Sequence, residues 1–430
     1  MRAASPSRLS RAAGHAPYNV TMRTLIALLA SLGAVAASAP SGASAAGPRA
    51  PTISDAGRTQ LSSFLTAAVH SGDVPGIVAL VTSADSELYV EAVGNANVAE
   101  RRPMGRGTIF RIASMTKPLT SVAAMMLYEQ GKLALDEPVS AYLPDYVQPP
   151  VVASFDPSSG RVTTRPAQRL ITIRHLLTHT SGIGYGLDDP ILAALQSAGT
   201  KGDELPLVHD PGEKWTYGSN TYVLGRVVEK VSGQPLDALF RSRIFDPLEM
   251  ADTFYRVPDE KHERLVTRHQ RKDGTLTETP NSSIENAPVR GDGGLSSTAH
   301  DYGAFLRMLL NGGDSGRGRL LSARTVGMMT RNQIGNLTLR EMPAAMPAIA
   351  RSFPAGAGHD TFGFGFQVAA RGTSARSRGS YSWAGVYNTY FWVDPERRIG
   401  VVLLMQILPF FDDACKRLVS EFEDRLYRIM

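Results

Sequence analysis

Strand-like segments occur at both ends of this chain, and mostly helical patterns lie between them. Residues 76–83 (GIVALVTS) and 87–94 (ELYVEAVG) are short, apolar and β-branched, and the three residues between them predict a hairpin. Near the other end, four strand-like segments follow one another with short joints: 362–370, 379–385, 388–394 and 399–406. Strands need partners for their backbone hydrogen-bonding groups. The pattern therefore favours one antiparallel sheet that is built from both chain ends.

The middle of the chain predicts a separate helical part. The first helix is expected over residues 114–130, because Pro118 is tolerated only in a first turn and Gly131 supplies a C-terminal stop. We therefore expect an α/β (α+β) fold in which helices flank an antiparallel sheet and form a second lobe. The sheet lobe would take about 56–113 and 295–430, and the helical lobe about 114–294.

Three later segments complete the expected organisation. Thr298 and Asp301 have the spacing of a capping box for a helix through Leu310. A last helix is expected over about 412–426. Residues 333–361 have no regular pattern and predict a long loop, a kind of segment that is often functional.

The start of the chain has the features of an export leader. An apolar run over residues 25–37 follows a short basic stretch and ends in small residues, and Ala43 and Ala45 fit a cleavage site. We expect residues 1–45 to be a leader with a secretory signal peptide and 46–55 a linker. The apolar run is too short for a comfortable membrane span, so we expect an exported protein, periplasmic or secreted, without a stable membrane anchor.

Charge and cysteine content exclude several classes of protein. The formal net charge is +5, and residues 1–50 hold five arginines and no acidic residue. The remainder is balanced, so no electrostatic case for nucleic acid remains. The only cysteine, Cys415, cannot form an internal disulfide and is expected to be a packing residue.

Ser114 and Lys117 are the first candidates for chemistry. Residues three apart on a helix share a face, so the lysine amine can reach the serine hydroxyl. A serine is a poor nucleophile until another group takes its proton, and the positive potential at a helix N-terminus favours the alkoxide. The pair alone is a weak signal, because a motif of two residues also occurs by chance.

Two further stretches supply partners for this pair. Tyr217 in WTYGSN can act as a general base if it lies beside a lysine ammonium. In SWAGV, Gly385 would let a strand approach the scissile carbonyl, and the N–H of Val386 could join the N–H of Ser114 as an oxyanion hole. Trp383 in the same stretch also fits a core aromatic residue.

The three stretches together resemble a known superfamily. Ser114–Lys117 (SMTK), Tyr217–Ser219 (YGS) and Trp383–Gly385 (WAG), in that order, are similar to the signatures of the serine β-lactamases and penicillin-binding proteins. More narrowly they resemble the family VIII carboxylesterases, which are related to class C β-lactamases. Segments 172–183, 291–313 and 391–396 are similar to phrases of that family, and the likeness covers about 56–428. It implies a β-lactamase/transpeptidase-like fold and a catalytic domain over 56–430.

The resemblance also implies roles for single residues. Ser114 would be the acylated nucleophile, Lys117 would hold and share the proton, and Tyr217 would be the general base and acid. Ser219 stands where many relatives have an asparagine that contacts substrate or supports Lys117. Ser219 and the adjacent Asn220, which would compensate for this departure, are therefore expected as substrate contacts. Trp383, Ala384 and Gly385 would line the substrate site.

Trp383 is the departure that most affects specificity. β-Lactamases and D-alanyl carboxypeptidases commonly carry a lysine or histidine there, which helps to receive a substrate carboxylate. An indole offers apolar surface and one N–H donor. We therefore predict a serine hydrolase that acts on short- to medium-chain carboxylic esters through an acyl-enzyme. The alternatives are a D-amino-acid amidase or peptidase, a weak β-lactamase, an acyltransferase, or a non-catalytic sensor of penicillin or muropeptides.

Other signals carry less weight. His175 and His179 have the spacing of helical zinc ligands, but position 176 is leucine, so the metalloprotease motif is absent and neither a metal nor a cofactor is expected. Asp188 and Asp189 are interpreted as a solvated loop pair. The chain has no Gly-x-Ser-x-Gly motif, which leaves an α/β-hydrolase nucleophile elbow without support. The expected partner is a small ester or amide substrate, and the oligomeric state stays open.

Overall fold

The computed structural model describes residues 50–279, 281, 288–372 and 375–430. The leader at 1–45 and the first four residues of the linker at 46–55 lie outside these residues, so both stay predictions. Across the described ranges, no helix is both long and apolar enough to cross a bilayer.

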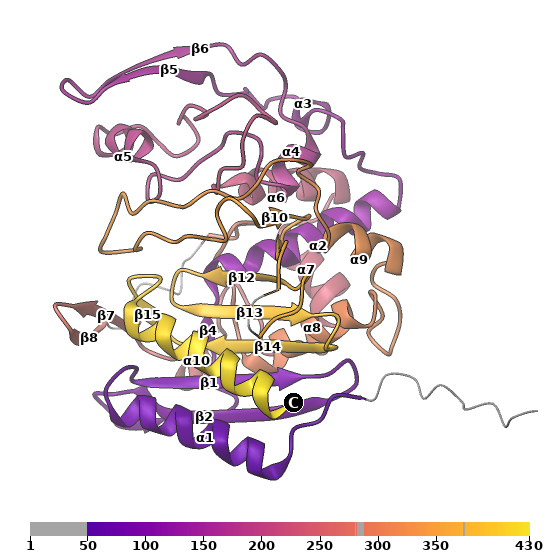
Figure 1. Ribbon diagram of the computed structural model, residues 1–430. Helices are drawn as coiled ribbons and strands as arrows, with labels where there is room; N and C mark the ends of the chain where they lie inside the picture. The colour runs from indigo at the N-terminus through magenta and orange to yellow at the C-terminus, as the bar shows by residue number, and fades with distance from the viewer. Residues whose placement is uncertain (1–49, 280, 282–287, 373–374) are drawn as a thin grey trace, which may run out of the picture. The chain divides into compact units, whose positions relative to one another are not determined.

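Residues 50–430 form one compact unit around an eight-stranded sheet, whose strands come from the early and the late parts of this segment (Figure 1). In spatial order its strands are β10 (Thr361–Phe362), β11 (Gln367–Val368), β12 (Tyr381–Gly385), β13 (Thr389–Asp394), β14 (Ile399–Leu404), β1 (Gly76–Thr82), β2 (Glu87–Asn97) and β3 (Arg102–Pro103). The late strand β14 pairs antiparallel with the early strand β1, with Val402 opposite Leu80. Every neighbouring pair is antiparallel. The predicted fold class is confirmed.

Both faces of the central strands are buried. On one face, the terminal helices α1 (Asp55–His70) and α10 (Asp413–Ile429) lie side by side (Figure 1). Leu65 and Phe422 of these helices belong to one apolar cluster with Ile77 of β1. On the other face, α8 (Ala299–Leu310) contacts β1 and β14. Cys415 of α10 is fully buried, as expected of a packing residue.

The helical part is centred on α2 (Thr116–Glu129), which is buried along most of its length. The remaining helical elements are η1 (Ala113–Met115), α3 (Val139–Tyr142), α4 (Ile173–Leu177), α5 (Pro190–Ser197), α6 (Asn220–Ser232), α7 (Leu236–Phe240), η2 (Arg241–Phe245), η3 (Asp259–Arg264) and α9 (Ala323–Met329). Ser114 lies in η1, which leads directly into α2, and because α2 packs against α6 and α7, these helices help to position that serine.

The structure corrects several local expectations. Residues 362–370 form a hairpin of two short strands instead of one strand, because Gly365 turns the chain at a φ of 96°. The middle region contains two hairpins that were not expected, β5 (Val151–Asp156) with β6 (Arg161–Arg165) and β7 (Arg268–Lys272) with β8 (Thr275–Thr279). Two further short pairings join β4 (Phe110–Arg111) to β9 (Ser296–Ser297) and β15 (Ile407–Leu408) to β7.

Candidate active site

Ser114 lies at the junction between the sheet and the helical part. It occupies the single 3₁₀ turn η1, which leads directly into α2, and its side chain is half-buried. The preceding residue, Ala113, has a φ of 45°, a left-handed conformation that is uncommon for a residue with a Cβ. Such strain is typical of functional sites, where the surrounding structure fixes a side chain in one direction.

Lys117 is almost completely buried, with 1% of its surface exposed. Its Nζ donates to Ser114 Oγ at 3.3 Å, to Tyr185 Oη at 3.2 Å and to the Asp292 backbone oxygen at 2.7 Å. Lys117 Nζ therefore has three hydrogen-bond partners, one of which is the candidate nucleophile.

Tyr185 and Asp292 were not identified from the sequence, and they fix the position of Lys117. The Tyr185 hydroxyl donates to Asp292 Oδ2 at 2.6 Å, and Arg290 binds the same carboxylate through two hydrogen bonds of 2.9 and 3.0 Å. Burial alone would raise the pKa of Asp292, but the charges of Lys117 and Arg290 outweigh it and hold that pKa below its ordinary value. Burial and the Asp292 charge raise the pKa of Tyr185 well above its ordinary value, so this phenol stays protonated.

Tyr217 faces the same space as Ser114 and is held by aromatic neighbours. Its ring centroid lies 4.9 Å from Lys117 Nζ, and its hydroxyl accepts a hydrogen bond of 3.3 Å from Trp383 Nε1. His179 stacks on it with the ring centroids 5.1 Å apart. Burial, together with the Lys117 charge, lowers the pKa of His179 well below its ordinary value, so the imidazole is neutral. The structure thus brings Ser114, Lys117, Tyr217 and Trp383 together.

Gly385 on β12 allows the strand to pack against the backbone that precedes Ser114. A Cβ at this position would lie 2.3 Å from the Ile112 carbonyl oxygen and 2.3 Å from Thr389 Oγ1. Glycine is therefore required here for the close approach to Ile112 and Thr389, and because Gly385 also lines the cavity, its expected place beside a substrate carbonyl stays a prediction. Ala384 and Val386, on either side, line the cavity described below.

Ser219 and Asn220 are not in the cavity wall. Asn220 is fully buried at the start of α6 and donates to His179 Nδ1 at 3.0 Å and to the Ile183 carbonyl at 3.2 Å. Its Oδ1 accepts from Ser181 Oγ at 2.5 Å. Because these bonds use the amide inside the protein, Asn220 supports the histidine under Tyr217 and is not placed to contact substrate.

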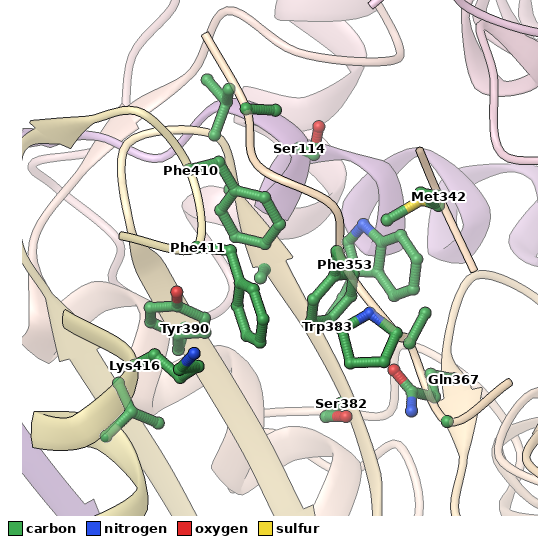
Figure 2. Close-up of a pocket in the computed structure, with 18 of the residues that line it drawn as sticks. Ser114, Met342, Phe353, Gln367, Ser382, Trp383, Tyr390, Phe410, Phe411 and Lys416 are labelled. Carbon is green, nitrogen blue, oxygen red and sulfur yellow. The ribbon is translucent and has the colours of Figure 1, made fainter. Parts of the chain in front are cut away.

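A cavity of about 590 Å³ opens from Ser114. Figure 2 shows Ser114 at one end, with Trp383, Phe353, Phe410, Phe411 and Tyr390 further along. The rings of Phe353 and Phe411 lie 4.9 Å apart. The lining is therefore mainly aromatic and aliphatic, as in most pockets for small organic ligands.

The long loop at 333–361 forms one wall of this cavity. It contributes Met342 and Phe353 to the lining. Its backbone is tied to both sides of the cavity, since the N–H of Ala345 donates to the Leu187 carbonyl at 2.9 Å and the N–H of Phe410 donates to the Ile349 carbonyl at 2.8 Å. The loop is thus a fixed cover of the site in this structure.

The two histidines with zinc-like spacing have other partners. His175 Nδ1 accepts from the Thr172 backbone N–H in the cap of α4, and His179 contacts Asn220 and Tyr217. Within the described part of the chain, no group of three or more metal-ligating side chains is close enough to hold a metal ion.

The fold and this arrangement define a serine hydrolase. The family comparison agrees with it: residues 61–423 match the Beta-lactamase family, so the chain belongs to that family. The resemblance inferred from the three motifs is thereby confirmed.

Characterised relatives have more than one activity. Over 411 residues the chain is 30% identical to Esterase EstB of Burkholderia gladioli, covering 86% of this chain and 94% of the relative. Over 389 residues it is 30% identical to the Monacolin J acid methylbutanoyltransferase of Aspergillus terreus (strain NIH 2624 / FGSC A1156), covering 84% and 93%. Among solved structures, unliganded Simvastatin Synthase (LovD) from Aspergillus terreus, in its selenomethionyl form, superposes with a TM-score of 0.74 at 27% identity, covering 86% and 98%.

Proposed function

We propose that this protein hydrolyses uncharged carboxylic esters with short to medium acyl chains through an acyl-enzyme on Ser114. One observation carries the proposal. The Ser114 hydroxyl is within 3.3 Å of a buried lysine amine, at the end of a cavity whose lining is mainly apolar. The candidate nucleophile thus lies next to both a proton acceptor and the space for a substrate.

The residues support a two-step reaction. Ser114 Oγ attacks the ester carbonyl carbon while its proton passes to the Lys117 and Tyr217 pair. The N–H groups of Ser114 and Val386 would bind the oxyanion of the tetrahedral intermediate. When the carbon–oxygen bond of the ester breaks, Tyr217 returns the proton to the leaving alcohol. Water then attacks the acyl-enzyme by the same path and releases the acid.

The substrate class follows from Trp383. Its indole lines the cavity where a cation would receive a carboxylate, and its N–H is already bonded to Tyr217. At this position Trp383 therefore offers a substrate carboxylate neither a charge nor a free indole donor. This argues against penicillins and D-Ala-D-Ala peptides as main substrates.

Acyl transfer is the second candidate, because one of the relatives is named as a methylbutanoyltransferase. An alcohol that enters the cavity in place of water would take the acyl group from Ser114 by the same chemistry. D-amino-acid amidase or peptidase activity and weak β-lactamase activity use the same acyl-enzyme and stay alternatives. The presence of Ser114, Lys117 and Tyr217 together argues against a sensor that has lost turnover.

A substrate screen tests the proposal. Esters of p-nitrophenol with acyl chains from acetate to decanoate are compared with nitrocefin and a D-Ala-D-Ala peptide. We expect the highest kcat/KM for a neutral ester, and adding an alcohol such as methanol should partition the acyl group between acid and new ester. Preference for nitrocefin or the peptide would contradict the substrate assignment, and binding without any turnover would favour the sensor.

A further inference from the structure

Asp188 is a half-buried acidic side chain in the wall of the catalytic cavity, and within the described residues no cation forms an ion pair with it. It follows Tyr185 closely in the chain and lines the same cavity as Ser114 and Tyr217. Its Oδ2 is fully buried and, within the described residues, has no hydrogen-bond partner. A buried carboxylate oxygen without a partner costs free energy, so its presence in the cavity wall points to a partner that the described protein does not supply.

The other charged side chains of the cavity lining differ from Asp188 in this respect. Lys416 pairs with Asp413 at 3.0 Å, Asp424 lies 4.0 Å from Arg428, and Arg376 pairs with Glu423. In the described parts of the chain, Asp188 has no ion pair within 4 Å.

The surroundings of Asp188 favour a cation over a neutral group. The aromatic side chains of Tyr185, Tyr217 and Trp383 line the cavity with it, and aromatic faces attract organic cations. A second cavity of about 210 Å³ shares Asp188, Tyr185 and Tyr217 with the first. Asp188 and Tyr217 thus border both spaces, which places the carboxylate on the side of the proposed proton donor to the leaving alcohol.

The ionisation of Asp188 is set by groups on several elements. Burial raises its pKa to about 7, the Lys117 charge opposes that rise, and Asp189 adds to it. The other titratable or charged groups that line the second cavity with it are Tyr185, Asp189, His209, Lys214, Tyr217, Arg340 and Glu341. Burial lowers the pKa of His209, so this imidazole is neutral at neutral pH, and Lys214 lies 3.3 Å from Glu213.

We propose that Asp188 is a specificity-determining residue that receives the ammonium group of an ester whose alcohol part is cationic. The inference rests on the proposed ester hydrolysis at Ser114 and names a preferred class of substrate for it. An amino-alcohol ester would place its ammonium between the carboxylate and the aromatic rings while its carbonyl lies at Ser114.

An isosteric pair of substrates isolates the charge. Butyrylcholine and 3,3-dimethylbutyl butyrate have the same shape and acyl group and differ only in the positive charge. Their kcat/KM ratio cancels the pH dependence of the shared catalytic groups. We expect the ratio to favour the cation and to rise as pH increases from about 5.5 to about 8.5, because a carboxyl group that titrates near neutrality becomes charged in this interval.

Replacement of the carboxylate gives the decisive comparison. Asp188→Asn should lower the ratio by roughly tenfold at high pH, the size of one charge interaction at moderate dielectric, and should remove its pH dependence. Asp189→Asn is the matched control, because the Asp189 carboxylate caps α5 by accepting from the N–H groups of Ile191 and Leu192. It should retain the preference for the cation at high pH. A ratio that Asp188→Asn leaves unchanged would overturn the proposal, since a carboxylate that only balances Lys117 would affect both esters equally.

Binding measurements keep this test separate from that of the proposed function. The two esters are titrated calorimetrically into Ser114→Ala and into the double variant Ser114→Ala, Asp188→Asn, with melting temperatures as the folding control. Tighter binding of butyrylcholine that disappears in the double variant supports the assignment of Asp188 even if the wild-type protein hydrolyses neither ester. Equal binding of the pair by Ser114→Ala would reject the Asp188 proposal and leave the assignment of Ser114 intact.

Discussion

Trp383 links the nucleophile region to the proposed specificity. Its indole N–H is bonded to the Tyr217 hydroxyl and its ring packs at 5.0 Å from the tyrosine ring. The side chain is only 6% exposed, so it is both a core aromatic residue and part of the cavity wall. The core interpretation of this residue is consistent with its burial, and its part in substrate selection stays a prediction.

Trp383→Lys should shift the preference towards carboxylate-bearing substrates. The new ammonium would lie in the wall beside Ser114, so the ratio of kcat/KM for nitrocefin to that for p-nitrophenyl butyrate should rise by roughly tenfold. Trp383→Phe is the control, because it removes the N–H without adding a charge and should lower both values together. An unchanged ratio in Trp383→Lys would remove the argument that this residue selects uncharged esters.

Single residues were predictable where a motif fixed their spacing. Short motifs contain Ser114, Lys117 and Tyr217, and the residue types in these motifs indicate a nucleophile with proton-transferring partners. Tyr185 and Asp292 act through contacts between segments far apart in the chain, and no local pattern marks them. Asp188, interpreted as part of a solvated loop pair, is half-buried with its Oδ2 fully buried, and an acidic loop residue gives no sign of such burial in the sequence.

At the scale of elements, the packing of β12 against the residues before Ser114 is the contact on which the site depends. Gly385→Ala should weaken that contact, because its Cβ would meet the Ile112 carbonyl oxygen at 2.3 Å. Forced overpacking of this kind typically costs about 1–3 kcal/mol of folding free energy, so we expect a lower melting temperature. We also expect kcat to fall by a larger factor than KM changes.

Gly327→Ala supplies the comparison for this variant. Gly327 lies in α9, where an added Cβ meets nothing within 4 Å, so its melting temperature and activity should stay near those of the wild type. If Gly385→Ala had the same melting temperature and the same activity as Gly327→Ala, the close approach of β12 would have no part in forming the site.

The elements that escaped prediction share a physical cause. The hairpins β5–β6 and β7–β8 are rich in polar residues, and most of their side chains are partly or fully exposed. They lack the alternation of apolar residues that marks a half-buried strand. The central strands β1 and β14 of the main sheet were predictable because burial on both faces requires continuous apolar runs.

At the scale of the whole molecule, the order of the segments predicted the architecture. Two groups of strands separated by a helical region can bury their edges by joining into one sheet, and β1 does pair with β14. The position of the loop at 333–361 over the cavity could not be predicted. It depends on backbone hydrogen bonds to Leu187 and Phe410, and backbone hydrogen bonds do not depend on the identity of the side chains.

Covalent labelling of Ser114 tests the central claim most directly. The intact protein is treated with an alkyl fluorophosphonate, its mass is measured, and the modified peptide is sequenced by mass spectrometry. We predict a single adduct on Ser114, formed in parallel with loss of ester hydrolysis and absent from Ser114→Ala. An adduct on a different residue, or ester hydrolysis that persists in Ser114→Ala, would contradict the account.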